Sequence, residues 1–196
     1  IWGFQTADAY FTADEAANGV VLADGSRVDI NSVYQKALYK GSFRYGEGDV
    51  KYVDVNGDGK VDTGKGTIDD HGDLIRIGNN QPRYEYSLRA GLQWKGLDFE
   101  FLFQGVGKRD FWTTSSLIIP FTQGRSMAIF TNQFDNYTPE NPNAKFPRPY
   151  IGHYGSTVNG LPNNGQNNFY SQTTDLSDFS YLRLKNVTIG YTLPKE

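Results

Sequence analysis

Cysteine is absent from this chain of 196 residues, which excludes both a disulfide framework and a thiolate metal site. Histidine is scarce as well: there are 2, and neither belongs to a metal-binding or nucleophile signature such as His-Glu-x-x-His. Carboxylates are plentiful, but no spacing between them singles out an acid and base pair. We therefore predict that the chain is not an enzyme.

Long apolar runs are also missing. No stretch of about 18 apolar residues occurs, which excludes a transmembrane helix but leaves a transmembrane β-barrel open. The net charge of −3 gives no reason to expect a nucleic-acid partner. The sequence begins with neither Met nor a signal peptide, so we expect a mature or partial chain. Its 15% of aromatic residues and its 22 glycines suit strands and turns, and they predict an all-β fold.

Residues 83–107 carry the clearest pattern in the chain, because apolar and polar side chains alternate there as in a strand with two different faces. The apolar row of the first arm is Tyr84, Tyr86, Leu88, Ala90, Leu92 and Trp94. The second arm continues it with Leu97, Phe99, Phe101 and Phe103. The opposite row is polar, with Leu102 as its one exception. These residues are therefore predicted to form an amphipathic β-hairpin.

Lys95 and Gly96 form the predicted two-residue turn of the hairpin, since Gly tolerates the positive φ that tight turns need. Counting from this turn fixes the register. The predicted facing pairs are Trp94 with Leu97, Leu92 with Phe99, Ala90 with Phe101, Leu88 with Phe103, and Gln93 with Asp98. Arg89 then lies diagonal to Glu100, where opposite charges can pair.

Two environments explain such a hairpin: the apolar face covers a protein core, or it faces lipid while the polar face lines a wet lumen. Strand length favours lipid, because about 9–11 tilted residues span the hydrocarbon and both arms of residues 83–107 exceed that length. In the lipid case the lipid-facing residues are Tyr84, Tyr86, Leu88, Leu92, Trp94, Phe99, Phe101 and Phe103. The lumen-facing residues are Arg83, Glu85, Arg89 and Glu100.

Residues 54–62 resemble a calcium loop, because oxygen-bearing side chains stand at alternate positions before a glycine. The candidate ligands for Ca²⁺ are Asp54, Asn56, Asp58, Lys60 through its carbonyl, and Asp62. Position 12 of such a loop should be Glu, but it is Lys65, so the last carboxylate would come from Asp69, Asp70 or Asp73. The alternative is a tight turn with side-chain to backbone hydrogen bonds and no metal.

Several further elements are expected. Thr12 and Glu15 form a capping box that opens a short helix, and residues 28–38 can form a second one. Tyr181–Leu193 is the last strand, with a β-bulge near Lys185 and Asn186 where the apolar parity changes. An aromatic-rich connection of about 70 residues precedes it. Short turns on one side and long loops on the other are typical of an outer-membrane barrel.

The landmarks, in their order, resemble the SusC/RagA family of TonB-dependent outer-membrane transporters of the Bacteroidetes. The matching residues are 3–6, Phe11, 48–52, 54–62, 77–79, Pro82, 94–98, 103–105, 137–143, 147–148 and 180–194. The resemblance covers nearly the whole chain.

What the resemblance implies is a barrel of about 22 antiparallel strands around a plug, with long extracellular loops that contain short helices. Residues 1–82 would hold a strand end and an extracellular loop, 83–107 a transmembrane hairpin, 108–179 a second extracellular loop and 180–194 a transmembrane strand. The plug would lie outside this sequence. The transporter would sit in the Gram-negative outer membrane and import glycans or peptides with a SusD-like lipoprotein and the TonB complex. The alternative is a soluble calcium-dependent carbohydrate-binding β-module.

Overall fold

The computed structural model describes residues 1–38, 43–113, 130–150, 156–158, 161–163, 165–174 and 176–193. The chain divides into two compact units. The core unit comprises Ile1–Ile77 and Trp112–Asp175, and the sheet unit comprises Gly78–Phe111 and Leu176–Glu196. Parts of the predicted loop 108–179, including residues 114–129 and 151–155, lie outside the described residues.

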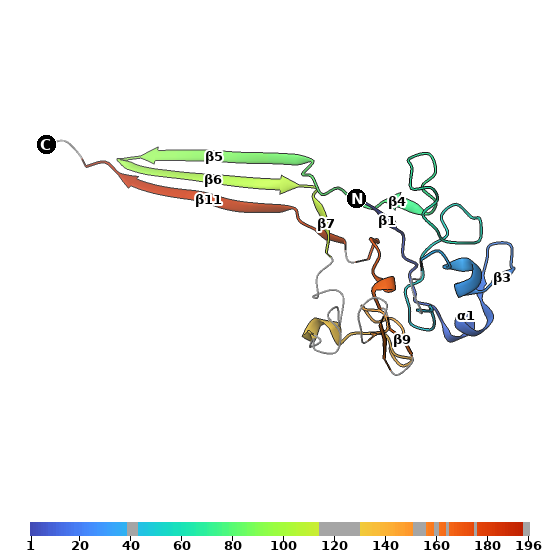
Figure 1. Ribbon diagram of the computed structural model, residues 1–196. Helices are drawn as coiled ribbons and strands as arrows, with labels where there is room; N and C mark the ends of the chain where they lie inside the picture. The colour runs from blue at the N-terminus through green and yellow to red at the C-terminus, as the bar shows by residue number, and fades with distance from the viewer. Residues whose placement is uncertain are drawn as a thin grey trace. The chain divides into compact units, whose positions relative to one another are not determined.

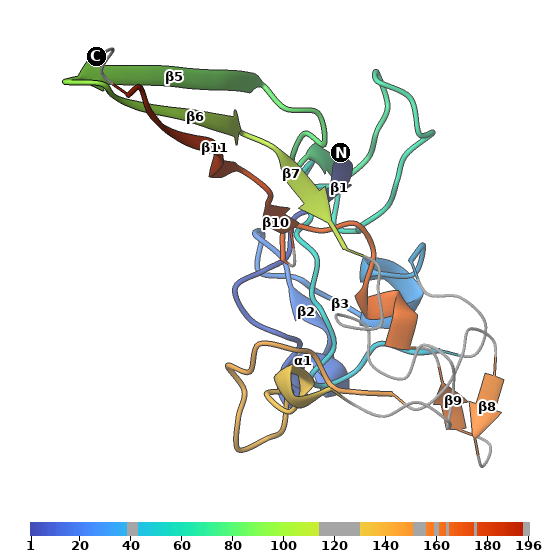
Figure 2. The ribbon, with the colours of Figure 1, turned by 90° about the vertical axis from the view of Figure 1, so that its left-hand side faces the viewer.

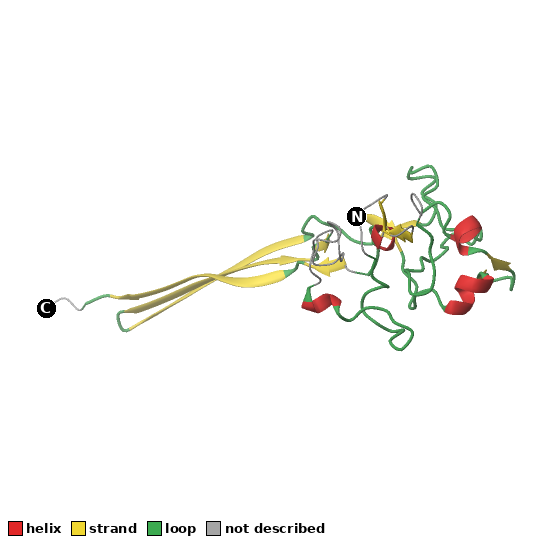
Figure 3. Ribbon diagram, turned by 60° about the horizontal axis from the view of Figure 1, so that its bottom comes forward, coloured by secondary structure: helices red, strands yellow, loops and turns green. Residues whose placement is uncertain are grey.

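The sheet unit is built on three long antiparallel strands in the order β11-β6-β5 (Figure 1). They are β5 (Tyr84–Trp94), β6 (Leu97–Gly107) and β11 (Tyr181–Tyr191), each 11 residues long. Figure 3 shows the three strands as one twisted ribbon, as the handed twist of strands requires. Beside them the short strand β7 (Asp110–Trp112) pairs with β10 (Leu176–Asp178) (Figure 2).

The register of the hairpin agrees with the prediction at every pair that was counted from the turn. Lys95 and Gly96 have φ of 48° and 84°, the mirror-image turn whose twist matches that of the flanking strands. Arg83 lies just before β5, outside the ladder. The alternation of side chains therefore predicted the hairpin to within one residue at its start.

The bulge in β11 is confirmed at the predicted place. The pairing of β11 with β6 shifts between Leu184 and Asn186, which leaves Lys185 as the extra residue. Because of the shift, Leu182 and Leu184 share a face with Val187, although their parity in the sequence differs. The strand ends at Tyr191, two residues before the predicted end.

Where the structure describes the core unit, its elements are all short. Its strands are β1 (Trp2–Phe4), β2 (Val20–Val21), β3 (Arg27–Val28), β4 (Leu74–Arg76), β8 (Ser156–Val158) and β9 (Leu161–Asn163). Its helical turns are α1 (Ala13–Asn18), the π-turn η1 (Ile30–Tyr34), η3 (Thr131–Gln133) and η4 (Gly165–Asn168). The pairs β1–β4, β2–β3 and β8–β9 form separate two-stranded sheets. Strands thus outnumber helices among the described elements, which confirms the all-β class.

The capping box of α1 is present, with Thr12 accepting from the Glu15 backbone N–H and the Glu15 carboxylate accepting from the Thr12 N–H. The second predicted helix is reduced to η1, whose Asp29 cap accepts from the N–H groups of Asn31 and Ser32. Among the described residues, no helix combines the length and the apolar character needed to cross a membrane.

The interior of the core unit is aromatic. Edge-to-face contacts join Phe43 to Tyr45 and Phe11 to Tyr34, with ring centroids 5.0 and 6.3 Å apart. The buried cluster is Phe4, Phe11, Val20, Ile30, Tyr34, Leu38, Phe43, Tyr45, Val50, Tyr52 and Val61. Side chains from loops and from the short elements β1, β2 and η1, rather than from a regular sheet or helix pair, therefore fill this core.

Candidate functional site

The three long strands gather most of their apolar side chains on one face, because residues that pair directly across antiparallel strands share a face. The exceptions, Leu102, Val106 and Tyr181, lie on the opposite face. This apolar face comprises Tyr84, Tyr86, Leu88, Ala90, Leu92 and Trp94 of β5, Leu97, Phe99, Phe101, Phe103, Gly105 and Gly107 of β6, and Leu182, Leu184, Val187, Ile189 and Tyr191 of β11. It contains all of the residues that the sequence assigned to a lipid-facing row.

The apolar face is uncovered. Leu92, Ile189 and Trp94 keep 67%, 72% and 62% of their surface exposed. Contiguous apolar surface of this extent is rare on a soluble monomer, where a large exposed patch marks contact with protein or lipid. The face therefore needs an apolar environment that the described residues do not supply.

The opposite face of the same sheet is polar. Arg89 and Glu100 form an ion pair across β5 and β6 in the predicted diagonal position. Glu85 also lies on this side, since it pairs with Val106 of the same face. A small hollow of about 200 Å³ opens between Arg89, Glu100, Asn186 and Thr188. Polar groups and space for water thus lie directly behind the apolar face.

Gly105 brings a tyrosine ring onto the sheet. A Cβ atom at Gly105 would lie 2.3 Å from the ring atoms of Tyr86, its facing residue. The ring of Tyr86 therefore covers the glycine backbone, an arrangement that compensates for the missing side chain in a strand. At Gly107 the corresponding distance to Tyr84 is 3.6 Å, so only Gly105 requires the absence of a side chain. The sequence analysis did not single out this pair.

Asp49 is the central polar group of the core unit, and its side chain is fully buried. Its carboxylate accepts from the Asn168 amide at 2.7 Å, the Gly46 N–H at 2.7 Å and the Tyr150 hydroxyl at 2.8 Å. Burial raises the pKa of Asp49 from 3.8 to about 6, while the three hydrogen bonds act in the opposite direction. One carboxylate therefore joins three segments that are far apart in the sequence.

The candidate calcium loop is closed by its own side chains. The Asp54 carboxylate accepts from the N–H groups of Gly57 and Gly59 at 2.6 and 2.8 Å. The Lys60 ammonium lies 2.6 Å from the Asp62 carboxylate and 3.5 Å from that of Asp58. Within the described ranges no group of three or more His, Cys, Asp or Glu side chains is arranged to hold a metal ion. Bound Ca²⁺ at this loop stays a prediction.

Asp73 lies outside residues 54–62 in the sequence, but its side chain contacts the backbone of this loop. Its buried carboxylate accepts from the backbone N–H groups of Val55 and Asp62 at 2.8 Å each. Burial raises the pKa of Asp73 above its ordinary value, and these hydrogen bonds offset only part of that rise. Of the three carboxylates that were considered for position 12, Asp73 is therefore the one that contacts the loop backbone at several points.

The fold and these faces define a β-rich chain whose long strands separate an apolar surface from a polar one. No protein-family profile matches the chain. Over 147 residues, 75% of the chain, it is 31% identical to "TonB-dependent receptor P26" of Formosa agariphila. The matched part is 13% of that protein's length. This likeness supports the TonB-dependent receptor family for this chain.

Proposed function

We propose that the chain is part of the barrel and the extracellular loops of a TonB-dependent outer-membrane transporter of the SusC/RagA type. The observation that carries the proposal is the uninterrupted apolar face of β5, β6 and β11, backed by a polar face with the Arg89–Glu100 ion pair. In a transmembrane barrel the first face contacts lipid and the second lines the lumen.

The dimensions of the sheet support this reading. Each strand has 11 residues, and about 9–11 tilted residues cross the hydrocarbon. The turn of two residues at Lys95 and Gly96 joins one end of the hairpin, whereas long connections leave its other end. That asymmetry is typical of barrels with short periplasmic turns and long extracellular loops. In this proposal residues 1–82 and 108–179 contribute extracellular structure.

The proposed activity is the import of glycans or peptides into a Gram-negative cell. The transporter would act with a SusD-like surface lipoprotein and would be driven by the TonB complex, which would contact parts of the full protein outside this chain. The support for this step is the ordered series of sequence landmarks together with the likeness to a protein named as a TonB-dependent receptor.

The alternative, a soluble calcium-dependent carbohydrate-binding module, has less support. A soluble module would need to cover its apolar face, yet that face is exposed at Leu92 and Ile189. The relative is named as a TonB-dependent receptor, which favours the transporter. We therefore carry calcium forward only as a proposed ligand of the Asp54 loop, to be tested separately.

Single-cysteine labelling tests the proposal, and the chain has no cysteine of its own. Leu92 and Gln93 are neighbours in β5 on opposite faces. In full-length protein in native outer membranes, Leu92→Cys should resist a charged maleimide and react with a lipid-soluble one. Gln93→Cys, the matched control, should react with the charged reagent.

The same contrast should repeat at Val187 and Thr188 of β11, which also lie on opposite faces. Equal labelling of both members of each pair by the charged reagent would overturn the lipid-facing assignment. Recovery of the full-length protein in the soluble fraction without detergent would favour the soluble module.

A further inference from the structure

The apolar face of the sheet unit changes its chemistry at the end that carries the Lys95–Gly96 turn. Trp94, Leu97 and Tyr191 pair across β5, β6 and β11 and form the last row of this face. The next three rows inward contain no side-chain nitrogen or oxygen; they are Leu92, Phe99 and Ile189, then Ala90, Phe101 and Val187, then Leu88, Phe103 and Leu184. Polar groups therefore begin at the turn, directly beyond a continuous hydrocarbon surface.

Lys95 places a charge at this end of the apolar face. Its side chain is exposed, and its ammonium lies 5.0 Å from the centroid of the Trp94 ring. Lys51 and Lys60 have carboxylate partners, whereas no described carboxylate forms an ion pair with Lys95. Asp98 is close in the sequence but lies on the polar face. The charge of Lys95 is therefore available to an external anion.

Tyr191 brings a second polar group to the turn. A Cβ atom at Gly96 would lie 3.4 Å from Cε2 of Tyr191, so the phenol end of the ring is level with the turn backbone. The Thr192 N–H donates to the Gly96 carbonyl at 2.7 Å, which ties the end of β11 to the turn. Among the described residues, neither the Tyr191 hydroxyl nor the Trp94 indole N–H has a hydrogen-bond partner. The turn thus presents an ammonium, a hydroxyl and an indole N–H on one edge.

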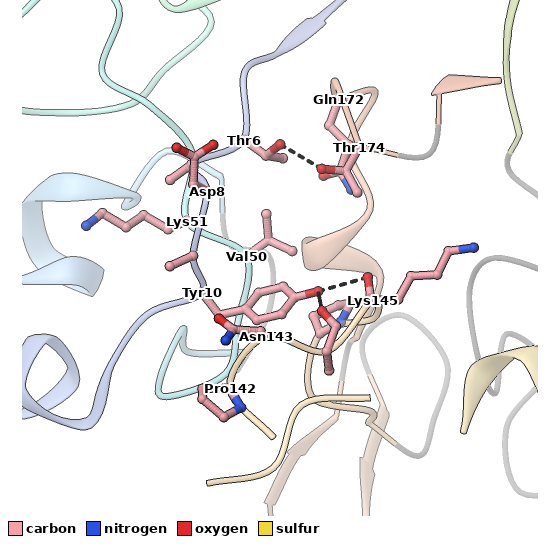
Figure 4. A pocket seen from close by; sticks show the side chains of 14 residues that line it. Thr6, Asp8, Tyr10, Val50, Lys51, Pro142, Asn143, Lys145, Gln172 and Thr174 are labelled. Atoms are coloured by element: carbon pink, nitrogen blue, oxygen red, sulfur yellow. Dashed lines mark hydrogen bonds between the residues drawn. The ribbon is translucent and has the colours of Figure 1, made fainter. Parts of the chain in front are cut away.

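These three groups can all donate a hydrogen bond, and none of them is a carboxylate. A phosphate, whose oxygens accept hydrogen bonds and carry negative charge, satisfies such a set. The cavity of about 210 Å³ in the core unit (Figure 4) is different, because the Asp8 carboxylate lines it together with the ammonium groups of Lys51 and Lys145. The wall of that cavity does not select a ligand by charge, whereas the turn end of the apolar face selects an anion.

We propose that Trp94, Lys95 and Tyr191 bind the phosphate group of a membrane phospholipid, an assignment that rests on the proposed membrane-spanning sheet. The hydrocarbon rows favour a lipid over free phosphate, because the acyl chains of the same molecule can pack against Leu97 and the rows beyond it. Short turns of such barrels lie on the periplasmic side, so the lipid belongs to the periplasmic leaflet. Interfacial aromatic rings alone position a barrel in a bilayer, whereas the Lys95 charge adds a preference for anionic headgroups.

Photo-crosslinking of the full-length protein in dodecyl maltoside tests the assignment. The probe is dioleoylphosphatidylglycerol with a diazirine on its glycerol headgroup, and crosslinked residues are mapped by peptide mass spectrometry. We expect crosslinks at Leu97, Tyr191 and Thr192. Excess dioleoylphosphatidylglycerol should displace the probe. Dioleoylglycerol, which lacks the phosphate, and glycerol phosphate, which lacks the acyl chains, should not.

Lys95→Asn removes the charge with little folding risk, because Asn before Gly is favoured in this type of turn. It should lower the crosslink yield at Leu97, Tyr191 and Thr192 about fivefold, whereas Lys95→Arg should keep it. Lys108→Asn is the matched control and should leave the yield unchanged. Lys108 also has a positive φ, 52° against 48° for Lys95, but it follows β6 at the opposite end of the sheet.

An unchanged yield in Lys95→Asn would overturn the assignment. Displacement of the probe by dioleoylglycerol as effectively as by dioleoylphosphatidylglycerol would also overturn it, since the site would then recognise only apolar chains. Equal displacement by glycerol phosphate would refute the lipid as the ligand. The labelling contrast between Leu92→Cys and Gln93→Cys separates the two proposals: if it holds while Lys95→Asn changes nothing, the phosphate site alone fails.

Discussion

Val187 offers a direct measurement of what the apolar face contacts. It lies near the middle of β11, opposite Phe101, and it is 49% exposed in the isolated sheet. If this position faces the centre of a bilayer, Val187→Lys places an ammonium in hydrocarbon, which costs about 2–4 kcal/mol in a transmembrane barrel. If it faces water, the same change costs little.

The expected penalty corresponds to a loss of about 30- to 1,000-fold in the folding equilibrium. Thr188→Lys is the control, because Thr188 is the next residue and pairs with Glu100 on the polar face. There the ammonium gains an opposite charge across the strands, a contact that contributes roughly 0.2–1 kcal/mol. The two variants add the same group one position apart, so their difference isolates the environment of the face.

The assay is the fraction of full-length protein that reaches the outer membrane as a folded barrel, read from its altered mobility in unheated gels containing detergent. We expect Val187→Lys to deplete this fraction strongly and Thr188→Lys to leave it near that of the wild type. Equal yields of the two variants would refute the reasoning, as would a greater loss for Thr188→Lys.

Three further predictions concern single positions. Burial raises the pKa of Asp49 from 3.8 to about 6, so the free energy of unfolding of the core unit should fall by about 3 kcal/mol as the pH rises through that window. Amide exchange of residues 43–52 should show this loss in the wild type and not in Asp49→Asn. The same pH dependence in Asp49→Asn as in the wild type would contradict the prediction. Gly105→Ala should lower the free energy of unfolding of the barrel by about 1–3 kcal/mol, because the new methyl group displaces the Tyr86 ring. Thermal unfolding followed by mobility in unheated gels measures this loss, and the control Gly107→Ala should show little of it. Calorimetric titration should detect Ca²⁺ uptake by the full-length protein that Asp54→Asn abolishes; no uptake by the wild type would remove the calcium site.

The sheet unit could be predicted from the sequence because its rules are local. A period of two residues fixes the faces, and the turn at Gly96 fixes the register. The bulge near Lys185 followed from the same rule. Leu184 and Val187 differ in parity, so only an extra residue between them allows both apolar side chains to lie on the apolar face. The diagonal ion pair of Arg89 with Glu100 then required no further information.

The core unit could not be predicted in the same way, because its contacts join distant segments without any period. The Val50 N–H donates to Asn168, which lies 118 residues further along the chain, and Tyr45 donates to the carbonyl of Asn167, 122 residues away. Nothing in the local sequence shows that Asp49 is fully buried whereas Asp54 is only half-buried. Local signals there were limited to short stretches, such as the capping box at Thr12 and the turn that begins at Asp54.

The unpaired edges of the three-stranded sheet show that the proposed barrel requires further strands beside β5 and β11. Among the residues that the structure describes, no strand pairs with the outer edge of β5 or of β11. In water such edges bind solvent, but in hydrocarbon each unsatisfied N–H or C=O group costs several kcal/mol. A lipid-facing apolar side and two bare edges are therefore incompatible. If Leu92 and Val187 contact lipid, both edges must pair with further strands, and amide exchange along the outer edges of β5 and β11 should be as slow as exchange in β6.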